Sequence, residues 1–315
     1  MKIQSLSIHV PTKGCVNNCK FCVSRMHESP YEDRIGQVYN DRDEPTFASD
    51  DKGFITEEYK RGILFCKENG VNTVILTGDG EALQNRRFLE YFGKQNNKWG
   101  FQWVELQTSG VMLVKYSSDG QQIDISTLAF LRRKVGVSTI SLSVSDLFNN
   151  ENNYKIQNTP EKLRFPIDII CKRIKKLNFN LRISLNLNSA FNDHHPADIF
   201  GRLKILGADQ VTFRKLYTSP SGNGDIPQNN WIENNPYNEK MFENIQEAVK
   251  KEGKFLGILP FGAAKYSIQG ISTVVDDNCM DDAHERPEPD VYKYLILRPN
   301  CKLYSSWDDQ GSLIF

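Results

Sequence analysis

The sequence carries no excess charge of either sign and no long hydrophobic run. Lys plus Arg number 39 and Asp plus Glu also number 39, so no overall field attracts the chain to nucleic acid or to an anionic membrane. No stretch of about eighteen or more apolar residues is present, and the N-terminus lacks a basic segment followed by an apolar one. We therefore expect a soluble, cytoplasmic protein with no membrane partner, for which a nucleic-acid partner is not favoured.

Cysteine is also scarce, and its distribution is uneven. The 315 residues contain seven cysteines, an odd number, and three of them lie between Cys15 and Cys22. An odd number of cysteines, three of which lie within eight residues, does not match a disulfide framework. It favours a metal site in a reducing compartment.

The group is a C-x3-C-x2-C triplet, Cys15, Cys19 and Cys22, which follows the apolar residues 6–10. Zinc usually takes four protein ligands as two separated pairs, and the second pair is missing here. A four-iron cubane held by three cysteines keeps one iron without a protein ligand and open to a small molecule. The triplet therefore favours an iron–sulfur cluster, with zinc as the alternative.

With Phe21 in the aromatic position before its last cysteine, the triplet resembles the signature of the radical S-adenosylmethionine (radical SAM) superfamily. The resemblance implies that Cys15, Cys19 and Cys22 bind a [4Fe-4S] cluster whose open iron chelates the amino and carboxylate groups of SAM. It further implies that one electron, from a reductant such as flavodoxin or ferredoxin, cleaves SAM to methionine and a 5′-deoxyadenosyl radical, which takes a hydrogen atom from the substrate. The contrasting interpretation is a non-catalytic iron–sulfur or zinc protein, or an electron-transfer protein.

Apolar strands alternate with amphipathic helices about six times up to residue 217, which predicts an α/β fold with a parallel sheet. The predicted strands are 5–10, 71–77, 103–108, 139–144, 180–187 and 210–215. The predicted helices are 56–69, 85–98, 123–135, 160–177 and 196–206, with an irregular polar insertion at 29–53 and an Asn-rich connector before residue 160. Six units agree with the partial (β/α)6 TIM-type barrel that the resemblance implies, and a closed eight-unit barrel is the alternative.

The composition changes after the sixth unit. Residues 219–238 are rich in Gly, Pro and Asn, which predicts a loop that leaves the barrel. A helix at 241–252 and short strands at 255–259, 266–275, 291–297, 303–306 and 313–315 predict a small antiparallel α+β extension. We therefore divide the chain into a barrel, 1–217, and a C-terminal extension, 218–315, which is a candidate cover for the substrate.

A second motif, Gly78, Asp79, Gly80 and Glu81, ends the second strand. Glycines let a backbone approach a ligand closely, and a neighbouring carboxylate can meet an ammonium group. The motif resembles the second conserved motif of radical SAM enzymes, which contacts the amino group of SAM, although Ala82 stands where that family usually has proline.

Polar side chains mark the third, fourth and fifth strands, where a barrel interior must satisfy them with SAM, substrate or water. Thr108, at the end of the third strand, is a candidate for SAM binding because small polar side chains there can line a cleft. By the same resemblance the other candidates for SAM binding are Ser143, Ser145, Arg182, Ser184 and Asn186. Arg214, in the sixth strand, is a candidate to grip a substrate carboxylate or phosphate, with an ion pair at the barrel rim as the alternative.

Other reactive side chains have simpler explanations. Cys66 and Cys171 fall in helices and are expected to be core residues, whereas an auxiliary cluster at Cys279 and Cys301 stays open. The histidines, His9 and the pair 194–195, are expected to be structural. The sequence identifies no catalytic side chain and leaves a small molecule, a nucleotide or a peptide as the substrate.

Overall fold

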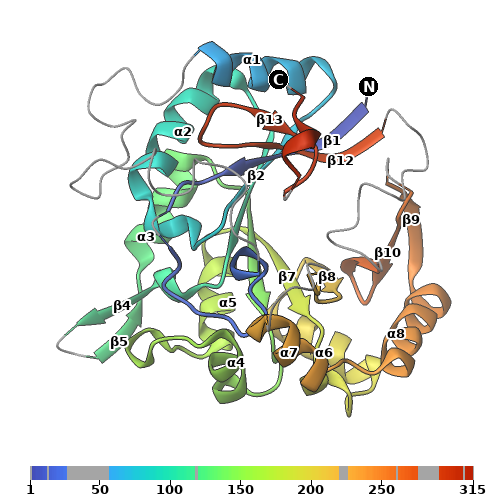
Figure 1. The fold of residues 1–315 in the computed structure, drawn as a ribbon. Helices are drawn as coiled ribbons and strands as arrows, with labels where there is room; N and C mark the ends of the chain where they lie inside the picture. The colour runs from blue at the N-terminus through green and yellow to red at the C-terminus, as the bar shows by residue number, and fades with distance from the viewer. Residues whose placement is uncertain are drawn as a thin grey trace.

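A computed structural model of the chain describes residues 2–12, 14–26, 57–117, 120–219, 226–259, 262–275, 291–307 and 309–314. Most of its strands belong to one large sheet, with helices around it (Figure 1). The predicted polar insertion at 29–53 lies outside the described residues. No helix in the described ranges has both the length and the apolar character needed to cross a bilayer.

The sheet has eleven strands, and its central part is parallel. In spatial order they are β13 (Leu303–Tyr304), β12 (Val291–Leu297), β1 (Lys2–His9), β2 (Thr73–Thr77), β3 (Trp103–Thr108), β6 (Thr139–Val144), β7 (Asn180–Asn186), β8 (Gln210–Arg214), β11 (Ile271–Val275), β10 (Ala264–Ile268) and β9 (Lys254–Ile258). Every pair from β12 to β11 is parallel, and only the β13–β12, β11–β10 and β10–β9 pairs are antiparallel. The predicted α/β class with a largely parallel sheet is therefore confirmed.

The sheet is open in the described part of the chain. Its edges, β13 in red and β9 in orange, are separate in Figure 1 and are not paired with each other. The described strands thus do not form the closed eight-unit barrel that we considered as an alternative.

Eight α-helices accompany the sheet in the described residues. They are α1 (Glu57–Glu68), α2 (Arg86–Trp99), α3 (Ile125–Phe130), α4 (Asn150–Gln157), α5 (Ile167–Lys176), α6 (Pro196–Leu206), α7 (Pro227–Asn234) and α8 (Glu239–Glu252). A separate hairpin, β4 (Val114–Ser117) and β5 (Gly120–Ile123), follows β3.

Local chemistry explains where these helices begin and end, as α2 shows. The Asn85 side chain accepts a hydrogen bond from the Phe88 amide and caps the first turn, and Gly100 ends the helix in the left-handed conformation, φ 70°. Phe88, Leu89 and Phe92 are buried on one face, so the helix is held by its packing as well as by its caps.

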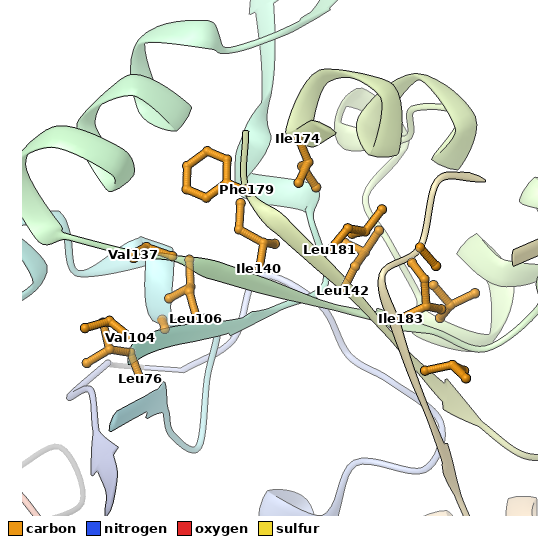
Figure 2. Close-up of a cluster of buried hydrophobic side chains, with 14 of the residues drawn as sticks. Leu76, Val104, Leu106, Val137, Ile140, Leu142, Ile174, Phe179, Leu181 and Ile183 are labelled. Carbon is orange, nitrogen blue, oxygen red and sulfur yellow. The ribbon is translucent and has the colours of Figure 1, made fainter. Parts of the chain in front are cut away.

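The hydrophobic core lies between the helices and one face of the sheet (Figure 2). Along β3, Val104 and Leu106 are buried in this layer, and Ile140 and Leu142 continue it on β6. Because side chains alternate along a strand, the residues between them face the other side of the sheet, and many of these are polar. The fold therefore separates an apolar outer face from a polar inner face.

The C-terminal third differs most from the sequence-based prediction. The extension is not simply antiparallel, because β12 pairs in parallel with β1 and β11 pairs in parallel with β8. The single strand predicted at 266–275 is a hairpin that turns at Gln269 and Gly270, both with positive φ. The predicted loop at 219–238 contains α7, a helix that Pro227 starts at its first turn.

Three other predictions within residues 103–177 also need correction. The Asn-rich connector is largely α4, whose first turn the Asn149 side chain caps. The helix predicted at 160–177 begins only at Ile167, because Pro166 precedes it. The helix predicted at 123–135 starts at Ile125 and widens into a π-helical turn, Leu131–Val135.

Truncation of the central layer tests the importance of this core. Leu106 is fully buried, so Leu106→Ala should lower the free energy of unfolding by about 2–5 kcal/mol through lost contacts and a residual cavity. Leu64→Ala is the matched control, because Leu64 is 53% exposed and its loss should change stability by only about 0.5 kcal/mol or less. Urea unfolding measures both, and equal effects would contradict the assigned core.

Candidate functional site

The three cysteines of the triplet lie in one loop after β1. Cys15, Cys19 and Cys22 are half-buried free thiols, and the loop ends in a short 3-10 helix, Val23–Arg25. Burial is the main cause that raises the pKa of Cys15 and of Cys19, and the charge of Cys22 raises both further. The three thiols are therefore close enough to influence one another electrostatically.

This donor set can be compared with what different metal centres require. Within the described ranges, no group of three or more His, Cys, Asp or Glu side chains is arranged to hold a single metal ion. In a cubane each thiolate binds a different iron, and a cluster held by three thiolates keeps one iron open.

The second motif packs directly against the cysteine loop. A Cβ atom on Gly80 would collide with the Thr12 hydroxyl oxygen and the Gly14 carbonyl oxygen. A Cβ on Gly78 would come within 2.8 Å of the Val10 carbonyl oxygen. Both glycines are thus needed because two backbones, from segments far apart in the sequence, approach each other closely.

Hydrogen bonds fix the cysteine loop to the residues after β2. The Val16 amide donates to Gln84 Oε1 at 2.8 Å, and Asn85 Nδ2 donates to the Pro11 carbonyl at 2.7 Å. Ser24 Oγ donates to the Asp79 carbonyl at 3.0 Å and lies 3.0 Å from Cys22 Sγ. Sequence reasoning missed these polar contacts, because nothing in their local pattern distinguishes them from ordinary loop residues.

Glu81 joins the ends of β2 and β3. Its side chain is buried, and its Oε1 accepts from Thr108 Oγ1 at 2.7 Å. Its Oε2 accepts from the Ser109 amide at 3.0 Å and from Ser109 Oγ at 2.8 Å. Both carboxylate oxygens therefore have protein donors, and Glu81 holds Thr108 and Ser109 in place beside the glycine motif.

Asn17, between the first two cysteines, is a site residue that sequence reasoning missed. It is 1% exposed, and neither its side-chain oxygen nor its side-chain nitrogen has a hydrogen-bond partner in the described part of the chain. A buried amide without partners is costly, so such a group often marks the place of a ligand. This orphaned amide, next to three thiols, fits a cofactor bound at the loop.

Two candidates on β6 and β7 contact each other, and a third is buried without a partner. Asn186 Nδ2 donates to Ser143 Oγ at 2.9 Å. The Ser145 side chain is fully buried, and its hydroxyl has no partner among the described residues. Ser184, buried on β7, pairs in register with Ser143. The structure thus gathers these serines and Asn186 on neighbouring strands.

Arg182 has protein partners on the inner face. Its Nη1 lies 2.5 Å from Glu105 Oε2, and its Nε and Nη2 donate to Gln210 Oε1 at 2.8 and 2.6 Å. These contacts tie β7 to β3 and β8 rather than to the cysteine loop. They favour a structural role for Arg182 over the predicted contact with SAM.

The remaining candidates lie as follows. Cys66 and Cys171 are fully buried, as predicted for core residues, and Cys301 is half-buried, whereas Cys279 lies outside the described residues. His195 caps α6 by accepting from the Ala197 amide through Nδ1, which agrees with a structural role.

His9 lies at the junction of the two motifs. Its ring is buried, and its Nε2 lies 3.7 Å from Asp79 Oδ2. The Trp307 ring approaches His9 with a centroid separation of 6.2 Å, and Trp231 approaches Phe21 at 6.0 Å. Two aromatic residues from the C-terminal part of the chain therefore contact the cysteine loop and the strand before it.

Comparison with known proteins gives a fold relationship and no close relative. No family model and no curated protein matches the chain. SuiB from Streptococcus suis matches with a TM-score of 0.52 and 14% identity, over 96% of this chain and 60% of SuiB.

Two further solved structures match less well, each with a TM-score of 0.48 and 15% identity. One is coproporphyrinogen III oxidase (HemN) from Escherichia coli, described as a radical SAM enzyme. The match extends over 82% of this chain and 54% of the HemN chain. The other is HydG, a maturase of the [FeFe]-hydrogenase, and the match extends over 89% of this chain and 57% of the HydG chain. The chain thus spans about 60% or less of the length of these proteins.

The match to SuiB extends over almost the whole of this chain, so the two proteins share a fold. At this low identity the comparison speaks for the fold alone. The assignment of individual site residues depends on the geometry described above.

A glycine substitution tests whether backbone contact holds the cysteine loop. Gly80→Ala should displace the loop, because the new Cβ overlaps Thr12 and Gly14, and the thiols of Cys15 and Cys19 should be alkylated faster. Mass spectrometry of the alkylated protein measures the rates. Gly201→Ala is the control, because a Cβ on Gly201, within α6, meets nothing within 4 Å. Equal alkylation rates in the two variants would show that the loop does not depend on this contact.

Proposed function

We propose that this protein is a radical SAM enzyme that cleaves SAM reductively and abstracts a hydrogen atom from a small-molecule, nucleotide or peptide substrate. The observation that carries the proposal is the packing of Gly78 and Gly80 against the cysteine loop. Two motifs about sixty residues apart, which separately resemble the cluster motif and the SAM motif of one superfamily, form one site at the ends of β1 and β2.

The cluster ligands in this proposal are Cys15, Cys19 and Cys22. When bound, a [4Fe-4S] cluster with one open iron and SAM together supply a carbon-centred radical that the protein itself has no side chain to generate. The protein's part is to hold the three thiols at fixed positions, which the contacts from Ser24 and Gln84 achieve. An external reductant of the flavodoxin or ferredoxin type supplies the electron.

The same segments offer groups for the methionine part of SAM. The backbone of residues 78–80 lies beside the cysteine loop, and the Asn17 amide has unused donor and acceptor capacity there. Glu81 acts indirectly in this proposal, because its carboxylate positions Thr108 and Ser109. Polar residues further along the sheet, Ser143, Ser145, Ser184 and Asn186, stay candidates for the ribose and carboxylate.

In our proposal, two described residues of the C-terminal part, 218–315, cover this site. Trp231, from α7, approaches the aromatic residue of the cysteine triplet, and Trp307 approaches His9. Aromatic side chains at these two positions would restrict water around the reacting groups, which a radical mechanism requires. The domain boundary at residue 217 stays a prediction, since β11 and β12 belong to the large sheet.

The alternative is a protein that binds a cluster for structure or electron transfer alone. Such a protein needs neither the orphaned Asn17 amide nor a glycine motif packed on the loop. SAM cleavage separates the two functions, because only the enzyme produces 5′-deoxyadenosine.

Loss of one cysteine tests the cluster and the reaction together. Cys22→Ala removes one of three ligands, so it should abolish both iron–sulfur incorporation and 5′-deoxyadenosine formation from SAM after anaerobic reconstitution and reduction. Cys66→Ala is the matched control, because Cys66 is buried in α1 and should leave both intact. Full activity in Cys22→Ala, or equal losses in the two variants, would refute the ligand assignment.

Substitution of the buried carboxylate separates SAM binding from cluster binding. In Glu81→Gln an amide nitrogen replaces an oxygen that accepts from Thr108 or Ser109, so SAM affinity should fall by roughly tenfold while iron content is unchanged. Equilibrium dialysis with labelled SAM measures the affinity. Glu247→Gln, at an exposed position on α8, is the control. An unchanged SAM affinity in Glu81→Gln would remove this residue from the site.

A further inference from the structure

A cavity of about 300 Å³ lies on the polar inner face of the sheet. Strands from both ends of the strand order contribute to it, including β1, β2 and β12 on one side and β8, β10 and β11 on the other. The sheet therefore curves around this space. Pockets for small molecules begin at roughly 300 Å³, so the cavity fits a metabolite-sized ligand.

The cavity adjoins the glycine motif. Thr77 and Gln107 line it, and the next residues along the chain are Gly78 of that motif and Thr108, which bonds to Glu81. A molecule in the cavity would thus lie next to the proposed SAM site.

Positive charge does not define this cavity, although four basic residues line it. Arg182 is balanced by Glu105, whose Oε2 lies 2.5 Å from Arg182 Nη1. Arg214 and Lys293 also interact with other residues of the chain. The fourth basic residue is Lys265, on β10. Since three of the four interact within the protein, selection of a ligand depends on the neutral polar groups of the lining.

Gln210, on β8, is held in one orientation. Arg182 Nε and Nη2 donate to Gln210 Oε1 at 2.8 and 2.6 Å. A guanidinium group can only donate, so the atom that faces Arg182 must be the oxygen of the carboxamide. The side-chain nitrogen of Gln210 has no hydrogen-bond partner among the described residues. Because Gln210 lines the cavity, this nitrogen is a fixed donor for a molecule bound there.

Gln107, on β3, has a similar arrangement. Its Oε1 accepts from Thr77 Oγ1 at 3.0 Å, and its side-chain nitrogen has no partner in the part of the chain that the structure describes. The two glutamines belong to one row of paired residues across the sheet, with Ser141 on β6 and Arg182 on β7 between them. Three strand spacings separate them, or about 14 Å along the sheet. Because the sheet curves, Gln107 and Gln210 approach a ligand in the cavity from two sides.

The remaining neutral groups adapt to a ligand and do not select it. Ser7, Thr212 and Ser272 line the cavity, and their hydroxyls have no hydrogen-bond partner within the described ranges. A hydroxyl rotates to donate or to accept, whereas a carboxamide nitrogen and the ammonium group of Lys265 only donate. The lining therefore matches a ligand with acceptor oxygens. A neutral carbonyl accepts such bonds without the counter-charge that a buried carboxylate or phosphate needs.

We propose that the cavity binds the substrate through neutral carbonyl groups, of the amide type present in a peptide unit or a pyrimidine base, and that Gln107 and Gln210 donate to the carbonyl oxygens. The role as substrate rests on the proposed radical SAM function, because the cavity adjoins the glycine motif of that site. Among the substrate classes that the sequence left open, this proposal selects a small molecule with uncharged carbonyl groups.

Binding of small probes to the anaerobically reconstituted protein tests the proposal. N-acetylalanine methylamide carries peptide carbonyls and uridine carries base carbonyls, so the two probes distinguish the sources. Ribose, which has hydroxyls and no amide carbonyl, and acetate, which is an anion, are the comparisons. Saturation-transfer NMR titrations at constant ionic strength give a Kd for each probe. At least one carbonyl probe should bind saturably and about tenfold more tightly than ribose or acetate.

Replacement of glutamine by glutamate tests the two donors with little change in shape. In Gln210→Glu one carboxylate oxygen still accepts from Arg182, but the other replaces the donating nitrogen and repels a carbonyl oxygen. Gln210→Glu and Gln107→Glu should therefore each weaken binding of the better carbonyl probe by roughly tenfold. Gln102→Glu, at an exposed position outside the cavity, is the matched control and should bind as the wild type does. The substitutions on β3 and β8 are independent, so misfolding of one variant, seen by circular dichroism, leaves the other as the test.

The outcomes separate this proposal from the proposed function. Saturable binding of the peptide or the base probe, weakened in the cavity variants, supports the carbonyl site, and the better probe identifies the source of the carbonyl group. Absence of saturation by both probes, tighter binding of ribose or acetate, unchanged binding in the cavity variants, or equal weakening in Gln102→Glu overturns it. If 5′-deoxyadenosine forms while no carbonyl probe binds, only the cavity assignment fails; if a carbonyl probe binds but SAM is not cleaved, the proposed function fails and the cavity loses its role as a substrate site.

Discussion

The close approach of two backbones is the contact on which the proposed site depends. Gly80 lies so near Thr12 and Gly14 that any side chain would displace the cysteine loop, and Gly78 lies equally close to the end of β1. This approach brings together a cysteine triplet and an acidic glycine motif that α1 and β2 separate in the sequence. Neighbouring hydrogen bonds, such as that from Val16 to Gln84, then give the loop a fixed position.

The alternation of side chains along the parallel strands extends this arrangement into the molecule. Residues such as Leu106 and Ile140 pack in the hydrophobic core, whereas Gln107 and Arg182 face the inner side. Because the C-terminal ends of parallel strands carry the loops, the cysteines and the glycine motif lie at one end of the inner surface. Side chains on one face of these strands therefore stabilise the fold, and side chains on the other face are available for binding.

The sequence predicts those features that depend on local pattern. The six strands and the two motifs were found because apolar alternation and the spacing of Cys15, Cys19 and Cys22 are visible within short windows. The parallel pairing of β12 with β1 was missed, since the pairing of distant strands is not encoded in either segment alone. The orphaned Asn17 amide and the pairing of Arg182 with Glu105 were also missed, because burial and long-range partners arise only in the folded chain.

The central claim is that three cysteines leave one iron open and that SAM binds to it. The most direct measurement is electron–nuclear double resonance on the reduced, anaerobically reconstituted protein, with SAM isotopically labelled at its amino nitrogen and its carboxylate oxygen. The account predicts hyperfine coupling of both labels to the cluster. A cluster that forms but whose spectrum is the same with and without SAM would contradict it and would favour a structural or electron-transfer role.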